Sequence, residues 1–261
     1  MINPHAVEPG ADAPAKGTVL LAEDDESIRD MFSFGLSRGG YRVRTAADGE
    51  AALAALEELE PDLVLLDVQM PRLNGFGVLE RLEVRQQRRP HVIMLSNLSQ
   101  PDEVRRGVDL GAIDWIIKAS VTPGTLARRI EQWMGVIARY GESAEPIDRT
   151  KYVDQQGRPF DTSPNAMLVA DNFARYVDAN EKGLELLGCD LTELVGRTVW
   201  DVTPNPLLLD GIAMWREFLT RGEDAGSYEL VNARGERRSI QYLARANVEP
   251  GRHLSIHTNS S

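Results

Sequence analysis

The sequence predicts an α/β domain with a doubly wound, five-stranded parallel sheet, followed by an α+β domain with an antiparallel sheet. Three observations lead to this fold class. Apolar runs of four to eight residues alternate with helical patterns over residues 18–140. Proline, glycine and charged residues then replace the periodicity at residues 141–150. Beyond that break, short strands come first, then helices, then strands again.

The first half supplies the expected parallel strands and the starts of their helices. Asp48 precedes a glycine and a run rich in alanine and leucine, which is typical of a helix N-terminus. Thr122 and Pro123 provide an N-cap followed by proline at the first helical position. We expect the strands near residues 18–24, 41–45, 62–67, 91–96 and 113–118.

The second half has short strands at 166–170 and 175–177, and helical segments from Asn180 to about Leu219. Three further strands are expected to start near Ser227, Glu236 and Arg252. The chain of 261 residues is long enough for two domains, each with its own core. The predicted organisation is a flexible leader at 1–16, the first domain at 17–140, a linker at 141–160 and the second domain at 161–261.

Composition limits the classes of function. The formal net charge is −11 and both halves are acidic, which disfavours a nucleic-acid partner because phosphate contacts require a basic surface. Cys189 is the single cysteine, which excludes an intramolecular disulfide and fits a reducing cytoplasm. No apolar run approaches the roughly 20 residues of a membrane-spanning helix, and residues 1–17 lack the features of a signal peptide. We therefore expect a cytoplasmic protein without a membrane partner.

Acidic, hydroxyl and amine side chains follow the predicted parallel strands, whose carboxyl ends meet in one crevice. Grouped carboxylates repel one another unless a hard cation such as Mg²⁺ binds between them. One aspartate is then available as a nucleophile towards a phosphoryl group, while a lysine and a hydroxyl can contact the phosphoryl oxygens. The residues at these strand ends are Asp24 and Asp25, Asp67, Ser96 and Lys118.

In their order along the chain, these residues resemble the receiver domain of two-component response regulators, which has a flavodoxin-like fold. The resemblance covers residues 17–140. It depends on Asp24 and Asp25, on Asp67 with the downstream Met70, Pro71 and Gly75, and on Ser96 and Lys118.

The receiver resemblance implies that Asp67 accepts a phosphoryl group from a histidine kinase or a phosphotransfer protein. Ser96 and Lys118 would contact the phosphoryl oxygens. Such a domain catalyses its own phosphoryl transfer and slow dephosphorylation, and is not otherwise an enzyme. The implied Mg²⁺ ligands are Asp24, Asp25, Asp67 and the main-chain carbonyl of Gln69.

Three positions depart from the family pattern. Receivers couple phosphorylation to their surface through the hydroxyl residue, here Ser96, and an aromatic residue three positions before the lysine, here Trp115. Tyrosine or phenylalanine is usual at that position, so Trp115 is either a restricted switch or a fixed packing residue. Ala119 replaces the usual proline, which predicts a trans or strained bond after Lys118. Asn97 replaces a small residue.

Residues 161–261 resemble a Per-Arnt-Sim (PAS) domain, which implies an antiparallel sheet and a helical flank around a pocket. Such pockets hold flavin, haem or metabolites, or hold nothing in domains that only dimerise. The ligand of this pocket is not identified by the sequence. The matching segments are residues 163–171, 176–180, 187–188, 194–197 and 228–238.

Two cofactors are disfavoured. Val199 stands where photoreactive members carry the cysteine that binds flavin, and Cys189 is better explained as a packing residue. Haem-binding members use a helical histidine, yet no histidine lies between His91 and His253. The pair His253 and His257 shares one face of a strand, as metal ligands or as ordinary core residues. The same choice between pocket and core applies to Trp200, Trp215, Tyr228 and Tyr242.

The last receiver helix carries an apolar stripe that permits two interpretations. The stripe either packs onto the sheet or extends as a connector that pairs two protomers. A homodimer would therefore form through this helix or through the PAS domain. The stripe consists of Leu126, Ile130, Trp133, Ile137 and Tyr140.

The leading hypothesis is a response regulator in which phosphorylation of Asp67 switches the interaction or dimerisation of the PAS domain. No DNA-binding, cyclase or kinase segment is recognised after the last predicted strand, so we expect output by interaction. One alternative makes the PAS pocket a ligand sensor that tunes a phosphorelay receiver. Another, a metal-dependent phosphate hydrolase, uses the same acids but lacks a second catalytic group of residues.

Overall fold

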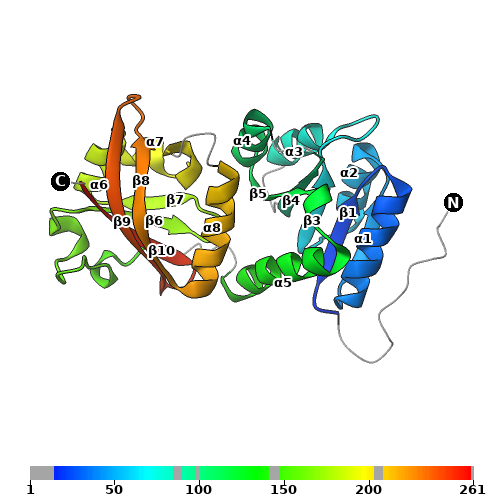
Figure 1. Ribbon diagram of the computed structural model, residues 1–261, viewed down its shortest axis with the longest axis horizontal. Coiled ribbons are helices and arrows are strands. Elements are labelled where there is room, and N and C mark those ends of the chain that lie inside the picture. The colour runs from blue at the N-terminus through cyan, green and yellow to red at the C-terminus, as the bar shows by residue number, and fades with distance from the viewer. Residues whose placement is uncertain (1–14, 85–89, 98–99, 141–146, 203–207, 260–261) are drawn as a thin grey trace. The chain divides into compact units, whose positions relative to one another are not determined.

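The computed structural model describes residues 15–84, 90–97, 100–140, 147–202 and 208–259. The chain divides into two compact units, Met1–Gly135 and Val136–Ser261. Each unit has its own sheet (Figure 1).

The first unit contains a five-stranded sheet in which all described pairings are parallel. The strand order is β2-β1-β3-β4-β5, so successive connections wind in both directions from β1. Each strand lies within two residues of its predicted position, which confirms the doubly wound α/β fold. The strands are β1 (Thr18–Ala22), β2 (Arg42–Ala46), β3 (Leu63–Asp67), β4 (His91–Ser96) and β5 (Ala112–Ile117).

Helices cover both faces of this sheet (Figure 1). Asp48 caps the second helix by accepting a hydrogen bond from Ala51 N–H, and Pro123 is the first residue of the last helix, as predicted. Among the described residues, no helix is both long enough and apolar enough to cross a membrane. The helices are α1 (Glu26–Arg38), α2 (Gly49–Glu58), α3 (Gly75–Val84), α4 (Pro101–Asp109) and α5 (Pro123–Tyr140), with a 3₁₀ turn η1 at Lys118–Ser120.

The apolar stripe of α5 belongs mainly to the core of its own unit. Leu126 and Ile130 are completely buried and Trp133 is 1% exposed. Ile137 is half-buried, and the side chain of Tyr140 lies outside the described residues. Trp133 Nε1 also donates a hydrogen bond of 2.8 Å to Asp114 of β5. This contact supports the interpretation as a helix packed on the sheet for the part of the stripe that reaches Trp133.

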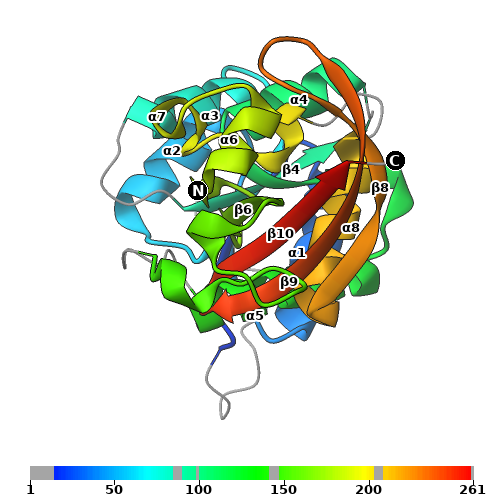
Figure 2. The same ribbon diagram turned by 90° about the vertical axis from the view of Figure 1, so that its left-hand side faces the viewer.

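The second unit has an antiparallel sheet, as predicted, and its strand order is β7-β6-β10-β9-β8. Figure 2 shows β6, β10, β9 and β8 of this sheet. Its strands are β6 (Ala166–Asp171), β7 (Tyr176–Ala179), β8 (Glu223–Val231), β9 (Arg237–Glu249) and β10 (Arg252–Asn259). One core is formed by the sheet with the helices α6 (Glu181–Leu187), α7 (Leu191–Leu194) and α8 (Leu208–Arg221) and the 3₁₀ turn η4 (Val199–Val202).

The opposite face of this sheet is covered by residues that the sequence assigned to a linker. Tyr152 and Phe160 are buried against Leu254 and Ile256 of β10. The 3₁₀ turns η2 (Arg149–Lys151) and η3 (Phe160–Thr162) belong to this layer. From residue 147 onwards, the predicted linker is therefore part of the second folded unit. The earlier residues 141–146 lie outside the described residues.

Candidate functional site

The register of the parallel sheet brings the site residues together. Ala22 of β1 pairs with Leu66 of β3, so the residues that follow them, Glu23 and Asp67, lie side by side. Ser96 of β4 pairs with Ile117 of β5, which places Lys118 beside the end of β4. All these positions are at the carboxyl edge of the sheet, where doubly wound folds hold their ligands.

Lys118 is the centre of this site. Its Nζ lies 2.8 Å from Glu23 Oε2 and 2.9 Å from Asp67 Oδ1. All three side chains are buried, with exposed fractions of 6% or less. One ammonium therefore pairs with two carboxylates that are almost completely removed from water, and one negative charge is left over when both acids are ionised.

Burial changes the pKa values in this triad. Desolvation raises the pKa of the Asp67 carboxyl, although the hydrogen bond and the charge of Lys118 oppose it. The pKa of Glu23 is raised for the same reason. Burial alone would lower the pKa of Lys118, but its hydrogen bonds to Glu23 and Asp67 raise it above the usual value. The lysine is therefore charged near neutral pH and holds the two acids together.

Three acids form a group suited to a hard metal ion. Glu23, Asp24 and Asp67 each offer a carboxylate oxygen, and these oxygens lie within 4.8 Å of one another. Asp24 is exposed, whereas the other two are buried. An all-oxygen donor set with one solvent-facing carboxylate fits Mg²⁺, which retains several waters when it binds to proteins.

The structure corrects one predicted member of this group. Asp25 does not join the acids, because its carboxylate accepts a hydrogen bond of 3.0 Å from Ile28 N–H and caps α1. The pair at the sheet edge is Glu23 and Asp24 instead of Asp24 and Asp25. Glu23 is not among the predicted site residues because the predicted first strand runs to residue 24. In the structure, β1 ends at Ala22, and Glu23 is the first residue beyond it.

The loop after β3 passes close to Asp67. The backbone N–H of Gln69 donates a hydrogen bond to the Asp67 carboxylate. Gly75 N–H bonds to the carbonyl of Val68, and a β-carbon on Gly75 would lie only 2.3 Å from the main-chain oxygen of Asp67. This close approach explains why glycine occupies the start of α3. Gln69 therefore lies beside the site. That its main-chain carbonyl binds a metal ion stays a prediction.

The remaining predicted positions are arranged around this centre. Ser96 is 4% exposed at the end of β4. Trp115 is 2% exposed, and its ring centroid lies 6.3 Å from that of Phe76. The peptide bond between Lys118 and Ala119 is trans, as expected without proline. The indole is thus packed inside the domain.

The predicted residues of the second unit are mostly core residues. His253 Nε2 lies 3.1 Å from Asn172 Oδ1, and its Nδ1 accepts a hydrogen bond from Asn247 N–H. His257 Nε2 lies 2.8 Å from Ser255 Oγ. In the described part of the chain, the acids around Asp67 are the group found that could hold a metal, and neither histidine belongs to it.

The aromatic residues and the cysteine of this unit are also packed. Trp200 and Trp215 form an edge contact with ring centroids 6.2 Å apart, and Tyr228 and Tyr242 form another at 5.7 Å. Cys189 is partly buried against the same core. The core interpretation therefore accounts for these side chains.

Comparison with known proteins identifies both halves. Residues 19–131 match the response regulator receiver domain, and residues 160–252 match the PAS fold. Transcriptional regulatory protein AfsQ1 of Streptomyces coelicolor is 32% identical, in an alignment that covers 68% of this chain and 70% of that protein. The probable transcriptional regulator ycf27 of Guillardia theta is 40% identical, and the chain spans only 46% of its length.

A solved structure is similar to the first half. The chemotaxis response regulator CheY4 of Vibrio cholerae is 34% identical and matches 46% of this chain and 98% of its own, with a TM-score of 0.41. The family match to the receiver, the parallel sheet and the residues at its edge agree with one another. The chain therefore belongs to the response regulators, with a receiver domain followed by a PAS domain.

Proposed function

We propose that Asp67 accepts a phosphoryl group, in the presence of Mg²⁺, from a histidine kinase or a phosphotransfer protein. The observation that carries this proposal is the buried triad, in which the Lys118 ammonium lies 2.9 Å from Asp67 Oδ1 and also pairs with Glu23. An ammonium beside a carboxylate nucleophile can contact an oxygen of an incoming phosphoryl group. The lysine would then exchange part of its contact with Asp67 for that oxygen.

The transfer replaces one bond to phosphorus by another. A carboxylate oxygen of Asp67 forms the new bond to phosphorus, and the bond between phosphorus and the donor histidine nitrogen breaks. The imidazole leaves with the electron pair of that bond. Lys118 and the hydroxyl of Ser96 are placed at neighbouring strand ends, where they would donate hydrogen bonds to the phosphoryl oxygens.

Glu23, Asp24 and Asp67 would hold the Mg²⁺ ion, together with the main-chain carbonyl of Gln69. The bound ion would neutralise charge on the phosphoryl oxygens. Asp24 is the exposed member of the group and would present the ion on the solvent side. Asp25, in contrast, would serve only as the helix cap.

We assign the output of this switch to the PAS half, through interaction with a protein or through dimerisation. Named relatives are transcriptional regulators, but the residues after the receiver here match a PAS fold and the chain carries a net charge of −11. That charge disfavours direct contacts to nucleic-acid phosphates. Because the first part of the α5 stripe is buried in its own unit, dimerisation is better assigned to the PAS half than to this helix.

The test is phosphorylation of the full chain by acetyl phosphate with Mg²⁺, followed by intact mass measurement. We expect the wild type to gain the mass of one phosphoryl group and Asp67→Asn to gain none. Asp25→Asn is the matched control, because asparagine preserves the N-cap. Equal labelling of Asp67→Asn would contradict the proposal. Loss of labelling in Asp25→Asn would contradict the assignment of the acids.

A further inference from the structure

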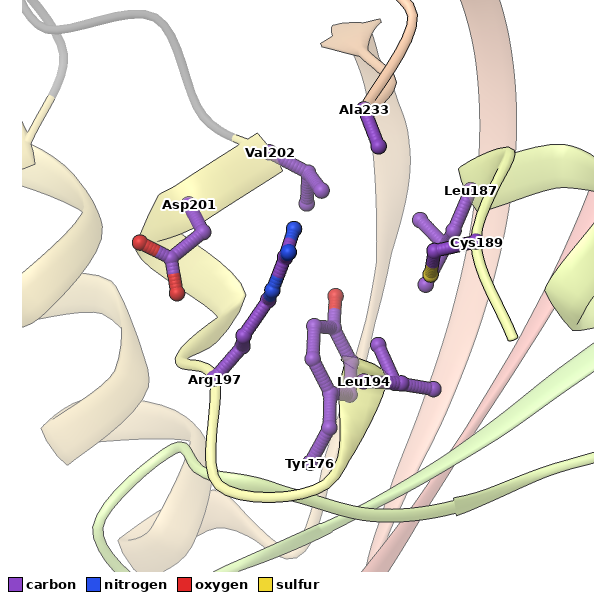
Figure 3. A pocket seen from close by; sticks show the side chains of 8 residues that line it. All are labelled: Tyr176, Leu187, Cys189, Leu194, Arg197, Asp201, Val202 and Ala233. Carbon is purple, nitrogen blue, oxygen red and sulfur yellow. The ribbon is translucent and has the colours of Figure 1, made fainter. Parts of the chain in front are cut away.

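The second unit contains a small cavity between β7, the end of α6 and the turn η4 (Figure 3). Its volume is about 30 Å³. The side chains of Leu187, Leu194 and Val202 form apolar walls. Polar groups of Tyr176, Cys189 and Arg197 also line it.

The hydroxyl of Tyr176 points into this cavity (Figure 3). Tyr176 is only 3% exposed, and its backbone is fixed by hydrogen bonds with Arg197 and Gly196. Within the described residues, however, the hydroxyl has no hydrogen-bond partner. Burial raises the pKa of Tyr176, so the hydroxyl keeps its proton. Since buried hydroxyls nearly always have a partner, this group is a donor available to a ligand.

The guanidinium of Arg197 also lines the cavity, and in Figure 3 it lies on the side of the Tyr176 ring that is away from Cys189. Arg197 is exposed, and across the described parts of the chain its side chain pairs with no carboxylate. Asp201 also borders the cavity, but its carboxylate is turned away and accepts hydrogen bonds from Thr198 N–H and Oγ1. Two donors, one of them a cation, thus face the cavity without a competing acid between them.

We propose that this cavity binds a small planar oxyanion, such as the carboxylate of a one- or two-carbon acid, between the Tyr176 hydroxyl and the Arg197 guanidinium. A planar, forked guanidinium matches the geometry of a carboxylate. One water molecule requires a cavity of about 10–15 Å³. The cavity volume of about 30 Å³ therefore restricts the ligand to a few heavy atoms. The apolar walls accept a methyl group, and the Cys189 thiol, whose pKa is raised by burial, remains neutral beside it.

Such a ligand would couple separate elements of the PAS fold. Tyr176 lies on β7, Arg197 follows α7, and Ala233 in the turn between β8 and β9 also lines the cavity. Ala233 N–H already bonds to the carbonyl of Leu187 at the end of α6. The proposal gives the PAS half an input of its own, independent of phosphorylation at Asp67.

The test is calorimetric titration of the full chain with sodium formate, acetate, bicarbonate and nitrate, with sodium chloride as reference at constant ionic strength. We expect saturable binding of at least one oxyanion and none of chloride. Tyr176→Phe removes only the hydroxyl and should weaken binding about tenfold or more, because a hydrogen bond to a charged group is lost. Arg197→Gln should abolish it. Arg245→Gln, the same change on β9, should leave it unaltered.

Circular dichroism of each variant establishes that the PAS half is folded. If Arg197→Gln fails to fold, Arg197→Lys keeps the charge but loses the fork, and should bind more weakly than the wild type. The absence of saturable binding of all four oxyanions to the wild type would overturn the proposal. Equal affinities of the wild type and Tyr176→Phe would overturn it as well, because the oxyanion would then bind elsewhere.

Discussion

Gly107 of α4 provides the space that the indole of Trp115 occupies. A β-carbon on Gly107 would lie 2.7 Å from Cζ3 and 3.1 Å from Cε3 of Trp115. The indole is 2% exposed and also contacts Phe76. The unusual tryptophan at the switch position is therefore accommodated by a glycine on the facing helix.

We predict that Gly107→Ala lowers the free energy of unfolding of the receiver by about 1–3 kcal/mol, because the added methyl group overpacks the indole. Trp115→Tyr should recover part of this loss in the double variant. Gly135→Ala in α5 is the control, since nothing lies within 4 Å of its β-carbon and helix propensity alone should give a gain of about 1 kcal/mol. Urea unfolding gives the free energy of unfolding of the wild type, Gly107→Ala, the double variant and Gly135→Ala. Equal effects of the two alanines would exclude the proposed contact.

We predict that Lys118→Ala lowers the free energy of unfolding by about 3–5 kcal/mol, because it leaves two buried carboxylates without their cation. Mg²⁺ should stabilise this variant more than the wild type, since no ammonium then neutralises the acids. Lys16→Ala removes an exposed pair with Glu131 and should cost less than about 1 kcal/mol. Thermal unfolding with and without Mg²⁺ provides the comparison. If Mg²⁺ raised the stability of Lys118→Ala less than that of the wild type, the prediction would be wrong.

We predict that the PAS half loses stability as the pH falls below about 6.5. Burial, aided by the charge of Arg252, lowers the pKa of His253 to about 3. The unfolded chain therefore binds a proton below pH 6.5 that the folded chain cannot bind, and the free energy of unfolding falls towards pH 3. His253 alone should account for about 2 kcal/mol between pH 6.5 and 5.

The pH effect is measured by urea unfolding at several pH values. Fluorescence of Trp215, whose ring centroid lies 5.6 Å from that of His253, reports the transition. His253→Gln should flatten the dependence on pH, while His257, with a pKa lowered to about 4, retains its own contribution. A slope unchanged by His253→Gln would show that other groups cause it.

We predict that Asn180→Ala lowers the free energy of unfolding of the PAS half by about 3 kcal/mol. The Asn180 side chain accepts hydrogen bonds from Met167 and Gly183 N–H, and it donates to the carbonyls of Phe160 and Asn165. The alanine variant loses the N-cap and leaves buried groups unpaired. Asn180→Asp keeps the accepted bonds only and should cost less than alanine. Guanidinium unfolding measures both variants. If Asn180→Ala and Asn180→Asp lost the same stability, the whole effect would come from the bonds that Asn180 donates to Phe160 and Asn165.

Much of the receiver could be predicted from local patterns. Asp67, Ser96 and Lys118 each end or directly follow an apolar run, and the strands were correct within two residues. Asp25 was assigned wrongly because a carboxylate after a strand can either face the crevice or cap the next helix. Only the start of α1 at Glu26, which turns the Asp25 side chain towards Ile28 N–H, decides between them.

The PAS half shows the same limit at Tyr152 and Phe160. These residues are separated by polar and turn residues, so no periodicity marks them as core. They become core residues only because the face of β10 that carries Leu254 and Ile256 must be covered.

The sequence by itself determined the two fold classes and the order of the strands along the chain, and it pointed to Asp67 as the proposed phosphoacceptor, because apolar periodicity and strand-end residues are local properties. The tertiary structure alone decided that Glu23 joins Asp67 and Lys118, that Gly107 makes room for Trp115, and that Tyr176 and Arg197 face one cavity. These relationships connect residues far apart in the chain. They depend on strand register and side-chain packing, which no local pattern encodes.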